Sequence, residues 1–238
     1  LIAGCGTGKV VLSAAKMYKN SHIYAFDLSK NSLAYAKRIT EEFQQKNISF
    51  FQSDILETRE INKKFDIIEC TGVLHHMENP LLGLKNLVNL LKEDGYIKLS
   101  FYSNKSRKFV KMIREDIKKN KLKNTKENMI KYRNKMKLDY KNYTFTSSDF
   151  YSLSGFRDLF FNVKEHNFSQ IEVKKMINEC DLEFLGYYFR DPEIKNSYKK
   201  KYPQDTKCLN LENWDDFEDN NNLAFAETPF FWCKKIKK

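Results

Sequence analysis

The stretch that decides the fold is Leu1–Lys9, with the sequence LIAGCGTGK. Its apolar beginning ends in three glycines at alternate positions, and an amphipathic helical pattern follows from Val10. Glycine is required where the backbone takes a positive φ or approaches a ligand closely. A helix that begins beyond such a turn offers unpaired N–H groups to an anion. The stretch therefore predicts a strand, a glycine turn and a helix that together bind a nucleotide-like ligand.

The glycine spacing distinguishes between nucleotide-binding motifs. A dinucleotide fingerprint, G-x-G-x-x-G, would place its third glycine where the chain has Lys9. A phosphate-binding loop, G-x-x-x-x-G-K-S/T, needs four residues between its glycines, whereas only three separate Gly4 from Gly8. The spacing that remains is G-x-G-x-G, and the alternative is a glycine-rich turn that binds no ligand.

Strand patterns recur along the chain, with helical periodicity between the first five of them. After the opening strand they lie at residues 22–26, 48–52, 65–70, 95–102, 182–189 and 229–233. Alternating strands and helices predict a mostly parallel, doubly wound α/β sheet. The last two strands are separated by a polar loop without a crossover helix, so we expect an antiparallel pair that completes seven strands.

Polar residues follow several of these strands. Asp27 ends the second strand, 19 residues after Gly8, and Asp54 follows the third. Ligands of parallel α/β sheets bind at the carboxyl ends of the strands. Asp27 is therefore placed to accept hydrogen bonds from a ribose diol. The alternative is that Asp27 caps the next helix, although Ser29 or Asn31 could do that instead.

These motifs resemble those of class I S-adenosylmethionine (SAM) methyltransferases, and the loop Gly72–His76, with the sequence GVLHH, resembles the LHH loop of many small-molecule methyltransferases. The resemblance implies a Rossmann-like fold, SAM as the cofactor, and an enzyme. It also implies that Asp27 binds the ribose and Asp54 the adenine, while the end of the fourth strand faces the methionine part. The implied cofactor-binding residues are Gly4, Cys5, Gly6, Thr7, Gly8, Asp27, Leu28, Asp54, Ile55, Thr71 and Gly72.

The whole chain is similar to the methyltransferase domain that follows tetratricopeptide repeats in many bacterial proteins. The segments that carry this similarity are 149–155, 157–161 and 165–168. It implies a helical lid after the fifth strand. Because the chain opens inside a strand and without Met, we expect it to be a fragment of a longer protein with an upstream repeat domain.

We therefore expect three parts. Residues 1–103 form the SAM-binding core, 104–167 a basic and aromatic helical lid, and 168–238 a helix and the strand pair that complete the sheet. The lid contains an aromatic and polar stretch, 143–161, where class I enzymes carry substrate-binding residues. The predicted acceptor-binding residues are Asp149, Tyr151, Arg157 and Glu165. Alternatively, the rings only pack the lid and Asp149 only caps a helix.

Three histidines are candidates for a general base, because an ordinary imidazole titrates near neutral pH. They are His75 and His76 in the GVLHH loop and His166 in the lid. Alternatively, the loop histidines only cap the following helix or shape the cofactor pocket.

The net charge of +11 belongs to one segment. Residues 104–141 hold 15 Lys and Arg against 4 Asp and Glu, whereas the rest of the chain holds 27 of each sign. Such a segment is either a surface for phosphate-bearing partners or a solvated helical face, and we favour the second.

The remaining composition points to a cytoplasmic protein. The five cysteines are scattered without a C-x-x-C pair, which argues against a zinc site or a disulfide framework. No apolar stretch approaches the ~20 residues of a membrane-spanning helix. We expect no metal site and no membrane span.

Two departures from the family pattern refine the function. The acidic residue usual two places before the first glycine is Ile2 here, and no Asn-Pro-Pro-Tyr-like motif of DNA amino-methylating enzymes follows the fourth strand. We therefore predict SAM-dependent methyl transfer to a small-molecule or metabolite acceptor. The alternatives are an RNA- or protein-directed enzyme that uses the basic face, or a non-catalytic interaction module.

Overall fold

A computed structural model describes residues 1–140, 148–161, 164–221 and 223–237 of the chain. Within these residues, one sheet has seven strands in the order β3-β2-β1-β4-β5-β7-β6. The strands are β1 (Ile2–Ala3), β2 (Ile23–Asp27), β3 (Ile48–Gln52), β4 (Phe65–Thr71), β5 (Leu91–Ser100), β6 (Leu182–Tyr188) and β7 (Phe230–Lys235).

The first five strands pair in parallel, and β7 is antiparallel to both β5 and β6. The predicted doubly wound, seven-stranded sheet with a final antiparallel pair is confirmed. Strand order reverses beside β1, with β2 on one side of it and β4 on the other. The carboxyl ends of these three strands therefore form the crevice in which such sheets bind ligands.

Alternation along the strands gives the sheet two apolar faces. Ile2, Ile23 and Ala25 pack with α1 (Lys9–Met17) on one face, and α2 (Lys30–Glu42) lies beside α1. On the other face, strand residues such as Ile68 and Ile97 pack with α3 (Pro80–Asn89) and α7 (Gln170–Asn178).

The fifth strand begins earlier than the sequence pattern indicates. We expected a strand over 95–102, but β5 already starts at Leu91. A register shift in its pairing with β4 and a positive φ of 62° at Asp94 accommodate the turn-forming residues inside the strand. Such a bulge lets the strand continue past residues that would otherwise terminate it.

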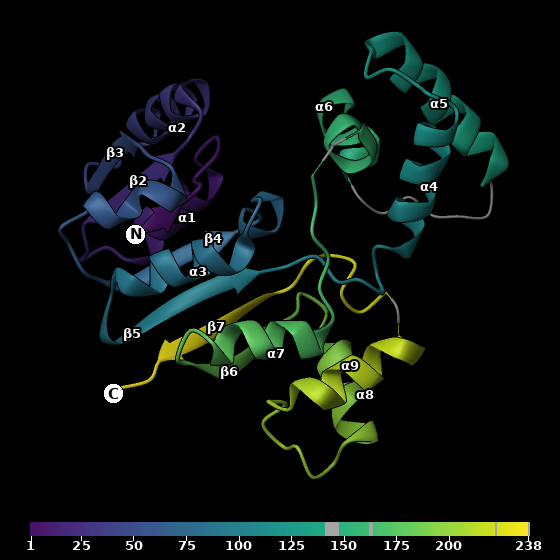
Figure 1. Ribbon diagram of the computed structural model, residues 1–238. Coiled ribbons are helices and arrows are strands. Elements are labelled where there is room, and N and C mark those ends of the chain that lie inside the picture. The colour runs from purple at the N-terminus through teal and green to yellow at the C-terminus, as the bar shows by residue number, and fades with distance from the viewer. Residues whose placement is uncertain (141–147, 162–163, 222, 238) are drawn as a thin grey trace.

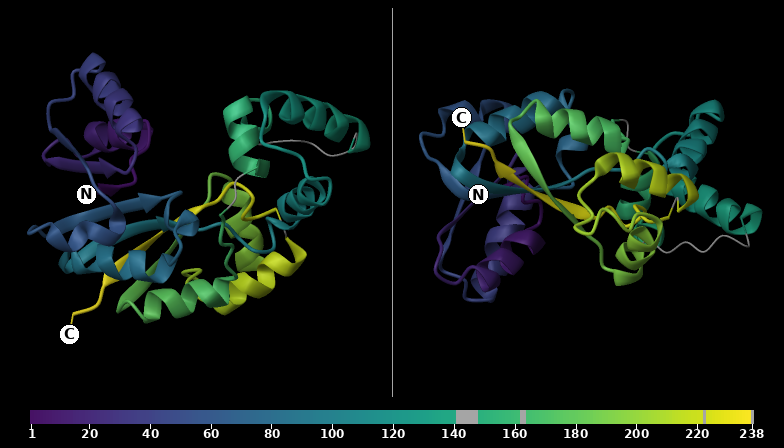
Figure 2. Two further views of the ribbon diagram at one scale, coloured as in Figure 1. Left: turned by 45° about the horizontal axis from the view of Figure 1, so that its top comes forward. Right: turned by 90° about the horizontal axis from the view of Figure 1, so that it is seen from below.

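The lid forms a second helical unit, shown in Figure 1 as a group beyond the end of β5. It contains α4 (Lys108–Lys119), α5 (Lys126–Asp139), α6 (Leu153–Phe156), a short 3-10 turn (Ser148–Phe150) and a π-helical turn (Arg157–Phe161). These elements share a hydrophobic cluster of their own, separate from both clusters of the sheet. Both views in Figure 2 also show the lid standing apart from α1 and α2.

The segment between β6 and β7 was wrongly predicted to be a polar loop. It contains α8 (Pro192–Lys201) and α9 (Leu211–Asn220), with Asp191 and Asn210 as their N-caps. Charged and polar residues outnumber apolar ones in both helices, and in α9 the apolar residues that pack inward are Leu211, Trp214 and Phe217, three residues apart. They pack through single large rings, because Trp214 stacks on Tyr198 with 3.8 Å between ring centroids.

None of the helices in the described residues has the length and apolarity needed to span a bilayer. The five cysteines are buried as free thiols. Among the same residues, no three or more histidine, cysteine or acidic side chains are grouped so as to hold a metal ion.

Candidate functional site

The glycine turn is bound to the end of β2 by its own backbone. The amides of Gly4 and Cys5 both donate to the carbonyl oxygen of Phe26 at 2.9 Å. The amide of the following residue, Gly6, donates to Asp27 Oδ2 at 2.7 Å. The turn and the carboxylate that the sequence analysis assigned to one ligand are therefore in direct contact.

Glycine is required in this turn for two different reasons. Gly4 and Gly8 have φ values of 71° and 90°, and a Cβ there would lie 2.5 Å from Val73 Cγ2 and 2.7 Å from Ala36 Cβ. Gly6 also has a positive φ, of 51°, but a Cβ on it would meet no described atom within 4 Å. Gly4 and Gly8 thus allow close packing, whereas Gly6 borders open space that a ligand can enter.

The carboxylate of Asp27 does not cap α2. Ser29 does so, because its hydroxyl oxygen accepts from the amide of Ser32 at 3.2 Å. Asp27 Oδ1 accepts from the amide of Ser29 at 2.9 Å, and Oδ2 accepts from Gly6. Each carboxylate oxygen can accept about two hydrogen bonds. Asp27 is thus held rigidly and keeps acceptor capacity for a ligand.

A pocket of about 340 Å³ lies beside this carboxylate, at the carboxyl ends of β1, β2 and β4. Its volume is in the range typical of small-molecule sites, about 300–1,000 Å³. It brings together six predicted cofactor-binding residues and one predicted base. The lining residues are Gly4, Phe26, Asp27, Leu28, Ser53, Asp54, Ile55, Leu56, Gly72, Val73, His76, Met77 and Glu78.

Asp54 has a structural task in addition to facing this pocket. Its Oδ1 accepts from the amide of Leu56 at 2.9 Å and caps the 3-10 turn η1 (Ile55–Glu60). The buried Asn86 of α3 donates to the carbonyl oxygens of Ile55 and Leu56, which fixes η1 against the sheet. The beginning of η1 is therefore held both by the cap at Asp54 and by Asn86.

The other predicted cofactor-binding residues are not among the lining residues of this pocket. They are Cys5, Gly6, Thr7, Gly8 and Thr71. Burial, assisted by the negative charge of Asp27, raises the pKa of the Cys5 thiol to about 12, so this cysteine is a packing residue and not a nucleophile. Thr71 pairs with Ser100, whose hydroxyl accepts from the amide of Gly72 at 3.0 Å.

His75 and His76 form η2 (Leu74–His76) but face different environments. His75 is 0% exposed, and within the described residues neither of its ring nitrogens has a hydrogen-bond partner. Its ring packs on Tyr102 with 3.9 Å between centroids. Burial, together with the neighbouring His76, lowers the pKa of His75 to about 3, so its ring is neutral at physiological pH.

His76 is partly exposed and lines the pocket. Its Nδ1 lies 3.1 Å from the carbonyl oxygen of Lys164. A carbonyl oxygen only accepts, so the proton of the neutral ring belongs on Nδ1, and Nε2 keeps a lone pair. Of the two loop histidines, His76 is the one whose geometry suits proton acceptance.

The segment Lys164–His166, which we call the strap, joins the lid to this loop. The amide of His166 donates to the carbonyl oxygen of His75 at 2.7 Å, while the His166 ring is exposed and stacks near Phe168. The side chain of Glu165 is 1% exposed and contacts two arginines of the lid, Arg107 and Arg114.

The arginines hold the Glu165 carboxylate with three short contacts. Arg107 reaches it through Nε and one terminal nitrogen, at 3.0 and 2.7 Å, and Arg114 reaches it at 2.8 Å. Burial alone would raise the pKa of Glu165, but the hydrogen bonds and charges of the arginines outweigh it and lower the pKa. Glu165, which was predicted to bind the acceptor, is thus a buried, ionised residue that bridges Arg107 and Arg114.

The remaining predicted acceptor-binding residues are placed on the lid, outside the pocket. Asp149 is exposed, Tyr151 is 62% exposed, and the exposed Arg157 forms an ion pair with its neighbour Asp158. Several rings of the aromatic stretch pack inside the lid itself, where Phe156 is 0% exposed. Residues 143–147 of that stretch lie outside the described residues.

The sequence analysis missed Tyr102, Arg107 and Arg114, which contact His75 or Glu165. The Arg107 guanidinium lies 3.8 Å from the centroid of the Tyr102 ring. Tyr102 is the second residue after β5, at the same end of the sheet as Asp27 and Thr71, and this position is a signal that could have identified it. The arginines lie in a segment rich in basic residues, so the sequence did not distinguish them from surface charges.

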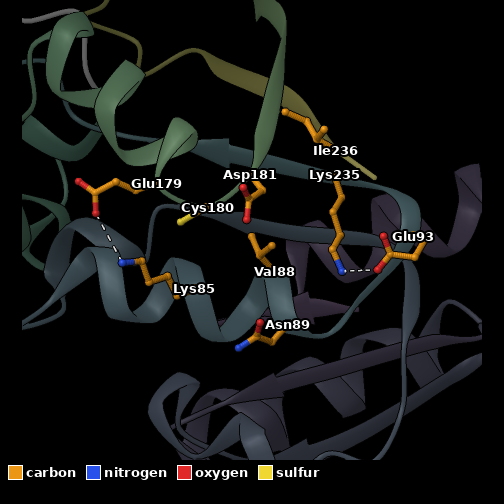
Figure 3. Close-up of a pocket in the computed structure, with 9 residues that line it drawn as sticks. All are labelled: Lys85, Val88, Asn89, Glu93, Glu179, Cys180, Asp181, Lys235 and Ile236. Carbon is orange, nitrogen blue, oxygen red and sulfur yellow. Dashed lines mark hydrogen bonds and ion pairs between the residues drawn. The ribbon is translucent and has the colours of Figure 1, made fainter. Parts of the chain in front are cut away.

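Another pocket, of about 380 Å³, lies at the other end of the strands, near the beginnings of β5 and β6 (Figure 3). Its charged groups already form pairs, Lys85 with Glu179 at 3.5 Å and Lys235 with Glu93 at 2.8 Å. It lies far from the carboxyl ends of the parallel strands, so the pocket beside Asp27 is the candidate cofactor site.

Comparisons with known proteins identify the family of the chain and its fold. Residues 3–143, more than half of the chain, match the family model described as a methyltransferase domain. PKMT2 from Rickettsia typhi, solved in complex with AdoHcy, superposes with a TM-score of 0.71 at 19% identity, over 99% of this chain and 48% of that chain. At this identity the similarity shows a shared fold.

Curated relatives match shorter parts of the chain. A probable (S)-tetrahydroprotoberberine N-methyltransferase 2 of Papaver bracteatum is 33% identical over 94 residues, 40% of this chain and 26% of that protein. A ubiquinone biosynthesis O-methyltransferase of Coxiella burnetii is 33% identical over 109 residues, 46% of this chain and 44% of that protein. The matches thus span less than half the length of either relative.

Proposed function

Because this chain belongs to the family of methyltransferase domains and has the class I SAM-dependent fold, we propose that it methylates an amine or hydroxyl of a small molecule. The observation that carries the proposal is the contact between Gly6 and Asp27 beside a pocket of about 340 Å³. The names of the relatives, an N-methyltransferase and an O-methyltransferase, support nitrogen and oxygen as acceptor atoms.

The residues present fit SAM. The open space beside Gly6 suits a ligand that lies against the backbone, and the Asp27 carboxylate keeps acceptor capacity for two vicinal hydroxyls. Asp54 and Ile55 would receive the adenine amino group and ring. Gly72, whose amide is held by Ser100, would border the methionine part.

SAM supplies a methyl group that is already activated by its sulfonium. The protein has to orient the acceptor behind that methyl and exclude water, and such orientation contributes several kcal/mol, up to roughly 7–11, to catalysis. An amine or hydroxyl acceptor also releases a proton. His76 Nε2 would accept it, since its Nδ1 is engaged by Lys164.

Calorimetric titration with SAM and S-adenosylhomocysteine tests the cofactor assignment. Asp27→Ala should weaken binding by about 1.5–3 kcal/mol, the worth of hydrogen bonds to a charged group. Asp66→Ala is a matched control, because Asp66 is also an aspartate on a parallel strand, but it lies at the exposed opposite end and pairs with Lys92. Equal affinities for wild type and Asp27→Ala would remove the ribose assignment.

The acceptor class is tested by S-adenosylhomocysteine release with panels of small amines, phenols, RNA and peptides. Turnover with small amines or phenols supports the proposal. An RNA-directed enzyme would instead use the exposed lysines near the α4–α5 turn, and its RNA binding would weaken steeply with salt. A protein that binds neither SAM nor its product would be a non-catalytic interaction module.

A further inference from the structure

The strap is anchored at each of its three residues, to two different parts of the molecule. Lys164 offers its carbonyl oxygen to His76, Glu165 binds two lid arginines, and His166 donates its amide to His75. The first and third contacts reach the loop that borders the pocket, and the second reaches α4. The strap therefore connects the position of the lid to that of the loop histidines.

The lid contacts converge on one carboxylate. Arg107 is the residue before α4, and Arg114 lies within that helix. Arg114 also donates to the carbonyl oxygen of Leu159 in the π-helical turn, at 3.0 Å. Removing the charge of Glu165 would leave both guanidiniums partly buried without their anion and would release the middle of the strap.

The loop contact decides the chemical form of His76. A neutral imidazole carries its proton on either nitrogen, and the hydrogen bond made by one nitrogen selects the tautomer. The 3.1 Å approach of the Lys164 carbonyl selects Nδ1–H and leaves Nε2 as the acceptor. This selection lasts only while the strap is held in place.

We propose that Glu165 is a positioning residue: by binding Arg107 and Arg114 it fixes the strap, and the strap keeps His76 in the Nδ1–H tautomer. The role of this tautomer in proton acceptance rests on the proposed function, but the link between Glu165 and His76 does not. The contact between the lid and the strap thereby determines which nitrogen of His76 carries the proton.

The test is long-range ¹H–¹⁵N NMR of the ¹⁵N-histidine-labelled full chain, with S-adenosylhomocysteine added, at about pH 8, where an ordinary histidine is neutral. Wild type should show a single Nδ1–H tautomer at His76, assigned with His76→Gln. In Glu165→Gln, which keeps the side-chain shape, we expect averaged nitrogen shifts of a tautomer mixture. His22, which bonds Ser49 far from the strap, is an internal reference that should not change.

Glu212→Gln is the matched control, since Glu212 pairs with Lys174 at an exposed position and should leave His76 unchanged. A folded Glu165→Gln variant with an unchanged His76 tautomer overturns the proposal, as does an equal change in Glu212→Gln. If Glu165→Gln fails to fold, Arg114→Gln replaces it, with a smaller change in the same direction expected. No change in that variant overturns the proposal as well.

The proposed role of His76 as the base fails in a different way. If His76→Gln retains methyl transfer with an accepted small molecule, His76 is not the base. The tautomer measurement on Glu165→Gln still decides whether the strap links the lid to the loop.

Discussion

The two sides of the site are built by different means. On the cofactor side, backbone amides of the glycine turn bind Phe26 and Asp27, and all of these groups lie within the first 27 residues. On the lid and strap, which we call the acceptor side because we propose that the acceptor binds there, the contacts are made by side chains such as Arg107 and Glu165, which are 58 residues apart. The cofactor side therefore depends on local backbone geometry, and the acceptor side on packing between distant segments.

This difference extends to the hydrophobic clusters. The strands that carry the glycine turn pack in the two clusters of the sheet, whereas the lid packs around Phe156 and its neighbours in a third. Because the clusters are separate, folding of the lid and cofactor binding should respond independently to substitutions, although the strap connects the lid to His76. The predictions below test this independence, beginning with the largest expected effect.

Phe156→Ala should unfold the lid and leave the cofactor pocket intact. Phe156 is 0% exposed, and truncation of a buried phenylalanine costs about 3–5 kcal/mol. Hydrogen exchange should lose protection in α4 and α5, while SAM affinity by calorimetry stays within two-fold, roughly 0.4 kcal/mol. Leu138→Ala, at a lid position 66% exposed, is the control. A parallel loss of SAM affinity would show that the two sides are coupled.

Two glycine substitutions should separate stability from binding on the cofactor side. In Gly8→Ala the new Cβ meets Ala36 at 2.7 Å with a φ of 90°, so positive-φ strain and overpacking together cost about 2–5 kcal/mol in the free energy of unfolding. Gly6→Ala suffers only the strain, about 1–2 kcal/mol, but places a methyl group in the space proposed for SAM. Urea unfolding and calorimetry should therefore rank the two variants in opposite order.

The sequence indicated the glycine turn and the Asp27 carboxylate that contacts it because the signals of both are local. Glycines at fixed spacing report backbone conformation directly, and an acidic residue after a strand reports its place at the sheet edge. The alternation of strand patterns and helical patterns along the chain predicted the fold. The helices α8 and α9 were missed because most of their residues are polar or charged, and only a few large side chains, such as Trp214, make the apolar face that packs.

The acceptor side could be predicted only in part. The sequence indicated His76 and Glu165 as polar residues of the site, but it could not indicate that Glu165 pairs with Arg114, 51 residues away. Nor could it show that His75 and His76, adjacent in the chain, differ in burial. These properties depend on how the lid packs against the sheet edge, and no local pattern records them.

The difference between the histidines predicts a pH effect on stability. The pKa of His75 is lowered from 6.5 to about 3 on folding, so the unfolded chain binds an additional proton between these values. Stability should therefore fall as pH falls below about 6.5, by ~1.4 kcal/mol per pH unit, or about 2 kcal/mol at pH 5. Urea unfolding of His75→Phe should lack this component, and an identical pH dependence in the variant would contradict the burial of His75.

The smallest effect tests how far the cofactor side relies on side chains at all. Asp54 Oδ1 caps η1, and asparagine caps about as well as aspartate, so Asp54→Asn should change the free energy of unfolding by less than about 0.5 kcal/mol. Its amide nitrogen would however replace the second oxygen, which we propose accepts from the adenine amino group. SAM affinity should then fall by about 1 kcal/mol, roughly five-fold. Unchanged affinity would mean that Ile55 and the backbone hold the adenine. Cofactor binding would then depend on a single carboxylate, that of Asp27. The cofactor side would differ even more from the acceptor side, where side-chain contacts predominate.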